Sequence, residues 1–276
     1  MKSICKPVVA GSFYSSNPEK LKKEIQGYLT NVSGPIPDEL NDILGIISPH
    51  AGYIYSGQCA AYSYKALQSK DFATAVIIAP SHQYGDFYYS VGDYDSFETP
   101  LGEIDVDRDL VKKMLSDSKF VFYHHAHSRE HSLEVQLPFI QIINPQAKIF
   151  PILIGYQYDQ SSLYLSQKLA ELFKDKMEKT VFIISSDLSH YHNHNQAEQM
   201  DKKLAEAIEK LEIETVDQLV KERKSEACGF GGILTIMNLA KLFNYPKVKT
   251  LKYMHSGTTS GDFDHVVGYL STLFYK

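Results

Sequence analysis

The chain has 276 residues, 43% of them hydrophobic and 22% charged, so it can bury a large core and does not have a disordered composition. Its net charge of −5 gives no electrostatic case for nucleic acid as the main partner. The three cysteines, Cys5, Cys59 and Cys228, are widely spaced and favour a reduced protein over a disulfide framework.

The N-terminal segment, MKSICKPVVAGSFY, lacks the apolar stretch of roughly 7–15 residues that a signal peptide contains. No apolar run approaches the roughly 18 residues of a membrane span. We therefore expect a cytoplasmic protein without a membrane partner.

Four short apolar runs rich in β-branched residues predict buried parallel strands, because both faces of each run are apolar. They cover residues 42–48, 74–79, 148–155 and 180–185. Apolar residues at helical spacing predict helices over 57–70, 107–118, 132–143, 161–175, 196–211 and 231–243. The alternation predicts one α/β domain over residues 1–276 with a largely parallel sheet. Residues 87–94 and 265–275 predict further strands, which we expect to be antiparallel at an edge.

Two of the predicted strands end in nearly the same way. ILGIISPHAGY carries His50 directly after a proline, and AVIIAPSHQYG carries His82 two residues after one. Proline ends a strand and stiffens the turn, and binding sites in open α/β sheets form beyond the carboxyl ends of strands. This placement favours a shared site. The alternative is two unrelated loop histidines that each bond a backbone carbonyl.

A third strand, in TVFIISSDLSHYHNH, ends on Asp187 and His190. The carboxylate can ligate a metal or orient a histidine by accepting its N–H, and the histidine can act as a general acid or base. Alternatively, Asp187 or the serines before it cap the next helix. His192 and His194 read as solvated loop residues.

The segment HHAHSREHSLEVQLPF places His131 at the N-terminus of a predicted helix and Glu134 in its first turn. Acidic residues are favoured there by capping and by the helix dipole, which is the structural interpretation of Glu134. The functional interpretation is a carboxylate that orients a histidine or transfers a proton. The histidines at 124, 125 and 127 predict a loop near a pocket mouth.

In SEACGFGGILTIMNLA, Cys228 precedes three glycines and a predicted helix. Glycine lets a backbone approach a ligand closely, and a cysteine at a helix N-terminus has a lowered pKa. Cys228 is therefore a candidate soft metal ligand or nucleophile, or else a small buried apolar residue at a tight turn. His255, at the end of a predicted strand in YMHSGTTSGD, is a candidate pocket residue or proton shuttle.

Five ordered motifs, SPHAGYIYSG, APSHQYG, REHSLEVQLPF, SSDLSHY and ACGFGG, resemble the MEMO family, and PVVAGSFYSSNPEKL resembles its N-terminus. Bacterial and archaeal members are labelled AmmeMemoRadiSam system protein B. The family is similar in fold to the class III extradiol ring-cleavage (LigB-like) dioxygenases. The resemblance therefore implies a three-layer sandwich with a mostly parallel or mixed central sheet, and its label suggests a radical-SAM partner protein.

The family's metal-binding set of two histidines and a cysteine falls on His50, His82 and Cys228, with Asp187 and His190 beside it. The related dioxygenases have a carboxylate where this sequence has the cysteine. Two imidazoles and a thiolate suit Fe(II), which we expect first, or Cu or Zn, rather than Mg or Ca.

Three functions remain open from the sequence. The first is a non-haem iron or copper oxidoreductase, dioxygenase-like, that acts on a small organic substrate with His190, Asp187, Glu134 and His255 as its proton-transfer residues. The second is a non-catalytic module that binds a peptide or protein in the same pocket. The third is a zinc hydrolase, in which the open coordination position activates water.

Overall fold

The structure is a computed structural model that describes residues 2–34, 36–37, 42–157 and 159–276. Within these ranges, nine strands form one mixed sheet in the order β10-β12-β2-β9-β3-β8-β4-β7, with β11 paired to β12. The strands are β2 (Ile43–Ser48), β3 (Thr74–Pro80), β4 (Tyr89–Val91), β7 (Phe120–Val121), β8 (Lys148–Ile154), β9 (Thr180–Ser185), β10 (Asp187–His192), β11 (Lys247–His255) and β12 (Val266–Tyr275).

The centre of the sheet is parallel and buried. β2, β9, β3 and β8 are neighbours in that order and are the four strands predicted from continuous apolar runs. In this register Ser48 lies opposite Ser185, and Pro80 lies opposite Ile154. The residues that follow β2, β3 and β9 therefore leave the sheet at the carboxyl ends of these parallel strands, as predicted from the sequence.

The remaining strands pair mainly in the antiparallel sense. β11 runs along one side of β12, β2 and β10 pair with its other side, and β12 is antiparallel to all three. The prediction for 265–275 was thus right about direction and wrong about an edge position. β11 pairs with residues 268–275 on its outer side, while the polar strand β10, DLSHYH, whose sequence lacks the apolar run of a buried strand, pairs with residues 266–269 on the other. β4 is antiparallel to β8, and β7 follows it.

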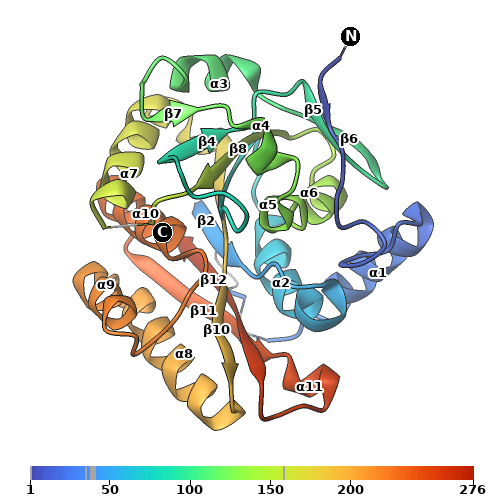
Figure 1. Cartoon of the computed structure of the whole chain (residues 1–276), viewed down its shortest axis with the longest axis vertical. Coiled ribbons are helices and arrows are strands. Elements are labelled where there is room, and N and C mark those ends of the chain that lie inside the picture. The colour runs from blue at the N-terminus through green and yellow to red at the C-terminus, as the bar shows by residue number, and fades with distance from the viewer. Residues whose placement is uncertain (1, 35, 38–41, 158) are drawn as a thin grey trace.

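Helices cover both faces of the sheet (Figure 1). α2, with α1, α5 and α6 beside it, lies on one face, and α10 and α7 lie on the other. The helices are α1 (Pro18–Thr30), α2 (Tyr53–Leu67), α3 (Arg108–Met114), α4 (His124–His127), α5 (His131–Glu134), α6 (Leu137–Ile143), α7 (Asp159–Phe173), α8 (His194–Glu209), α9 (Ile213–Lys221), α10 (Phe230–Leu242) and α11 (Gly257–Ser260). This arrangement confirms the predicted α/β sandwich with a mixed central sheet.

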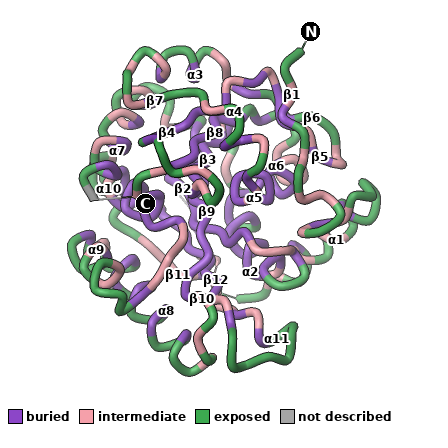
Figure 2. The backbone as a smooth tube through the Cα atoms, in the orientation of Figure 1, coloured by how far each residue is buried: buried purple, intermediate pink, exposed green. Residues whose placement is uncertain are grey.

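The predicted helix over 132–143 is two short helices, α5 and α6, because Pro138 lacks the N–H that would continue the hydrogen-bond ladder. A smaller sheet of β1 (Ile4–Cys5), β5 (Ser96–Thr99) and β6 (Gly102–Asp105) lies near the N-terminus. Figure 2 shows the buried backbone concentrated in the central sheet, with exposed backbone around it. In the described ranges, no helix has the length and apolar character to cross a membrane.

Candidate metal centre

His50 follows β2 and is almost completely buried, with 2% of its surface exposed. Its Nδ1 lies 2.8 Å from Ser185 Oγ, and the Ser185 hydroxyl donates its hydrogen to the carbonyl of Ser132. Because a hydroxyl has a single hydrogen, Ser185 must accept from the Nδ1–H of His50. The lone pair of His50 is therefore on Nε2, which lies 3.1 Å from Cys228 Sγ. This is the tautomer that binds a metal through Nε2.

Burial lowers the pKa of His50 well below its ordinary value, and positive charge on the neighbouring histidines at 82, 131 and 190 lowers it further. The imidazole is thus neutral at neutral pH, which is the form that binds a metal.

His82 follows β3 and is oriented by Glu130, a buried carboxylate. The backbone N–H of His82 donates to Glu130 Oε2 at 2.6 Å, and its Nδ1 lies 2.8 Å from Oε1. The carboxylate is an acceptor, so Nδ1 carries the hydrogen and Nε2 is the atom with a lone pair to offer a metal. Burial favours a lower pKa for His82, but the hydrogen bond and charge of Glu130 raise its pKa above the ordinary value.

Glu130 also caps α5 by accepting from the backbone N–H groups of His131 and Ser132. Sequence reasoning named Glu134 as the carboxylate of this segment and overlooked Glu130. The signal was an acidic residue directly before a helix start, since the oxygen that caps the helix has a further lone pair with which to accept from a histidine.

His131 completes a cluster of three imidazoles. The ring centroids of His50 and His82 are 5.3 Å apart, those of His50 and His131 are 5.4 Å apart, and those of His82 and His131 are 4.7 Å apart. One nitrogen from each ring lies within 4.8 Å of the other two. Sequence reasoning placed His131 at a helix N-terminus and assigned it no role.

Cys228 lies beside β10. Its backbone N–H donates to the carbonyl of Asp187, and its Sγ accepts from the N–H of Asp187 at 3.2 Å. With metal–sulfur and metal–nitrogen bonds of about 2.3 and 2.1 Å, ligands at a right angle lie about 3.1 Å apart. The separation of His50 Nε2 and Cys228 Sγ has this value. The donor atoms present therefore fit a borderline or soft metal ion.

Burial raises the pKa of the Cys228 thiol, and the charge of Asp187 adds to the effect. The expected lowering by a helix N-terminus is wrong, because Cys228 precedes α10 by two residues and is desolvated. A cation beside the sulfur is what would hold it as a thiolate.

Two of the glycines after Cys228 allow close packing. A Cβ on Gly229 would lie 2.3 Å from the carbonyl oxygen of Ser185, and one on Gly232 would lie 2.9 Å from Ile184 Cγ2. They let the start of α10 lie against β9 and so bring the thiol to the strand ends.

Asp187 and His190 lie next to the histidine cluster. Asp187 Oδ1 accepts the backbone N–H of His50 at 2.8 Å, and burial raises the pKa of this carboxyl to about 7. Burial lowers the pKa of His190, whose backbone N–H donates to Glu226. β10 changes register between these two residues, and Tyr191 has a positive φ of 63°. Such irregularities redirect side chains beside functional sites.

Glu134 is engaged elsewhere. It accepts from the hydroxyl of Tyr14 and from the backbone N–H groups of Val8 and Val9, so it holds the N-terminal segment against α5. Burial raises its pKa. His255 is also apart from the cluster, at the end of β11 beside His194 and Glu198.

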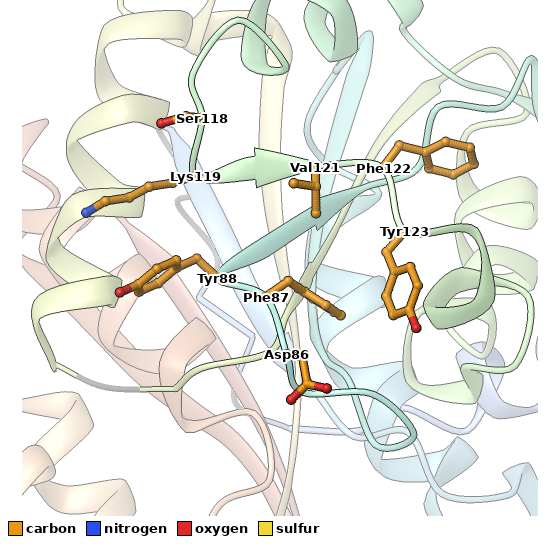
Figure 3. A pocket seen from close by; sticks show the side chains of 8 residues that line it. All are labelled: Asp86, Phe87, Tyr88, Ser118, Lys119, Val121, Phe122 and Tyr123. Carbon is orange, nitrogen blue, oxygen red and sulfur yellow. The ribbon is translucent and has the colours of Figure 1, made fainter.

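A hollow of about 410 Å³ lies along β4 and β7, lined by Asp86, Phe87, Tyr88, Ser118, Lys119, Val121, Phe122 and Tyr123 (Figure 3). In this view the rings of Phe87 and Tyr123 lie beside each other, and Lys119 extends toward Tyr88. The clustered histidines are not among its lining residues, so this hollow is distinct from the histidine cluster.

Comparison with known proteins adds a sequence relationship to this geometry. Residues 5–273 match the family described as "Memo-like protein". A "MEMO1 family protein" of Sulfurisphaera tokodaii is 37% identical, covering 97% of this chain and 98% of its own length. One from Nitrosopumilus maritimus is 36% identical over 96% of this chain and 98% of its own. One from Saccharolobus solfataricus is 37% identical with 97% and 98% coverage.

Proposed function

The chain belongs to the Memo-like protein family, and we propose that it is a metal-binding member whose ion is held by His50, His82 and Cys228. The observation that carries the proposal is the fixed tautomer of His50, which turns an unprotonated nitrogen toward the sulfur of Cys228. His131 lies close enough to supply a further nitrogen. Fe(II) is the ion we propose first, and copper or zinc would fit the same donors.

We further propose that the protein is an oxidoreductase that acts on a small organic substrate, similar in fold to the class III extradiol dioxygenases. When bound, iron or copper would supply one-electron and O₂ chemistry that side chains lack. Three protein ligands would leave coordination positions open, which is typical of reactive metal sites.

The chain's own residues would position groups and move protons. Ser185 and Glu130 hold the ligand histidines in one orientation and one tautomer each. Asp187, with a pKa near 7, can hold or release a proton at its carboxyl group around neutral pH. His190 would be a second proton carrier beside the cluster. It lies close enough to His50 for its positive charge to lower the pKa of that residue. Burial of His50, Ser185 and Asp187 keeps bulk water from this side of the site.

A non-catalytic protein-binding role is the second candidate, favoured by the exposed apolar residues Tyr88, Val121 and Phe122 at the hollow along β4 and β7. A zinc hydrolase would use the same three ligands. From the resemblance of the motifs to AmmeMemoRadiSam system protein B, we propose a radical-SAM protein as a partner, and we propose the cytoplasm as the location.

Metal analysis of protein purified without oxygen tests the site. We expect His82→Ala and Cys228→Ala each to hold about one equivalent of metal less than the wild type. His125→Ala, an exposed histidine outside the cluster, is the matched control. If both ligand variants keep the wild-type metal content, the proposed site is wrong. O₂ uptake with candidate substrates then separates oxidation from zinc hydrolysis and from binding without turnover.

A further inference from the structure

A second group of metal-ligating side chains lies far from the first, where α8 begins and β11 ends. His194 is the first residue of α8, Glu198 lies one turn later, and His255 is the last residue of β11. One ligand atom from each lies within 4.8 Å of the other two. In Figure 1 this region is at the lower end of the molecule, near α11, and the strand ends with the first cluster lie nearer the centre.

The local structure places these three side chains together. Residues four apart on a helix share a face, so the two from α8 point the same way. The side chain of Asn193 caps α8 by accepting from the N–H of Gln196, and the N–H of His194 donates to the carbonyl of Phe263 at 2.9 Å. The ring of Phe263 packs edge-on against both imidazoles, with centroids 5.4 Å from His194 and 5.8 Å from His255.

His255 is buried without the hydrogen bonds that a buried imidazole requires. It is 7% exposed, and its Nδ1 has no hydrogen-bond partner among the described residues. Its Nε2 lies 3.8 Å from Glu198 Oε1, which is beyond hydrogen-bond distance. Nδ1 faces Gly257, where a Cβ would come within 3.0 Å of it, so Nε2 is the atom that would bind an ion shared with Glu198. Two ligands of one tetrahedral ion with bonds of about 2.1 Å lie about 3.4 Å apart, so a small shift would let these two groups share an ion.

We propose that His194, Glu198 and His255 form a second binding site, for a divalent first-row transition metal such as Zn²⁺. Two imidazoles and one carboxylate suit ions of this class and not Ca²⁺ or Mg²⁺, which take mostly oxygen ligands. The side chain of Glu198 is 54% exposed, so the site opens to solvent and leaves room for a bound water. The ion would join the start of α8 to the end of β11. This proposal shares no residue with the first site and does not depend on it.

Co²⁺ titration tests the second site, because Co²⁺ reports its ligands through its visible spectrum. The protein would carry His82→Ala and Cys228→Ala, so that the first site is disabled. We expect one saturable Co²⁺ without a thiolate charge-transfer band, displaced by Zn²⁺. Adding His194→Ala or Glu198→Gln should weaken binding at least about tenfold. The matched control is His265→Ala, an exposed histidine near Phe263 but outside the group.

Both test positions are partly or largely exposed, so the variants should fold, and circular dichroism confirms this before titration. If the disabled background does not fold, the same titration on the otherwise wild-type chain distinguishes the sites, since only the first contains sulfur. The proposal fails if no saturable, thiolate-free Co²⁺ site exists. It also fails if such a site persists unchanged in His194→Ala and Glu198→Gln.

Discussion

The parallel and antiparallel halves of the sheet position their histidines in different ways. In the parallel half, each proposed ligand follows a strand end and has its own hydrogen-bond partner: Ser185 orients His50, and Glu130 orients His82. In the antiparallel half, Nδ1 of the buried His255 has no hydrogen-bond partner in the described part of the chain, and its neighbour Glu198 is largely exposed. The first site is thus organised before any ion arrives, whereas the second would be completed by its ion.

Among the substitutions that test this comparison, the largest loss of stability is expected at Glu130. Glu130→Ala removes the acceptor of three backbone N–H groups and of His82 Nδ1. Because these donors are left buried and unbonded, the free energy of unfolding should fall by about 4 kcal/mol. Urea denaturation measures it, with the exposed Glu171→Gln as the control. A loss below about 0.5 kcal/mol would mean that Glu130 does not organise the site.

A second test concerns the approach of Cys228 to the strand ends. Gly229→Ala places a Cβ 2.3 Å from the carbonyl oxygen of Ser185, so stability should fall by about 2–3 kcal/mol. Gly27→Ala in α1, where a Cβ would meet nothing within 4 Å, should instead stabilise by about 0.5–1 kcal/mol. Thermal unfolding compares them. Equal effects of the two substitutions would contradict the tight packing of α10 on β9.

Ser185→Ala sharpens the argument about tautomers. Without the hydroxyl, His50 Nδ1 loses its acceptor, and metal affinity at the first site should fall about 10–100-fold. Ser48→Ala is a closely matched control, because Ser48 lies opposite Ser185 in the sheet and its buried hydroxyl has no hydrogen-bond partner within the described ranges. Competition with a chromophoric chelator measures both. If the two variants bind the metal with equal affinity, Ser185 does not orient His50 for metal binding.

The smallest effect is expected from Asp201 in the antiparallel half. Burial raises the pKa of this carboxyl to about 6, while it accepts from Ser189 and the hydroxyl of Tyr253. Since the folded protein keeps this proton to higher pH than the unfolded chain does, its contribution to stability is lost as pH rises from about 4 to 6.

In Asp201→Asn, the loss of unfolding free energy between pH 4.5 and 7 should be smaller by on the order of 1 kcal/mol. Urea unfolding of the metal-free protein at the two pH values measures it. Glu171→Gln again serves as the control. A pH dependence identical to that of the wild type would show that Asp201 titrates normally.

Much of the parallel half could be predicted from the sequence. Continuous apolar runs identify buried parallel strands, and parallel topology brings their carboxyl ends together. This is why the sequence placed His50, His82 and Asp187 at one edge, and the structure brings them together there.

The remainder depends on contacts between distant segments that no local pattern encodes. β10 is too polar to read as a strand, and β12 pairs with it. Glu130 and Glu134 are equally suited to a helix start by local rules. Only the folded chain shows that the first faces His82 and the second faces Tyr14. The same holds for His194, which was read as a solvated loop residue and meets His255 through tertiary packing.

The contact between His50 and Cys228 has a consequence for how the protein would acquire the proposed ion. These residues are 178 positions apart in the chain. A nascent chain that has emerged from the ribosome only as far as α8 would offer imidazoles but no thiol from this pair. Loops of this length close late, after the local helices and hairpins have formed. Metal would therefore bind at the first site only when folding is nearly complete. Chains stalled earlier would remain unable to retain the ion.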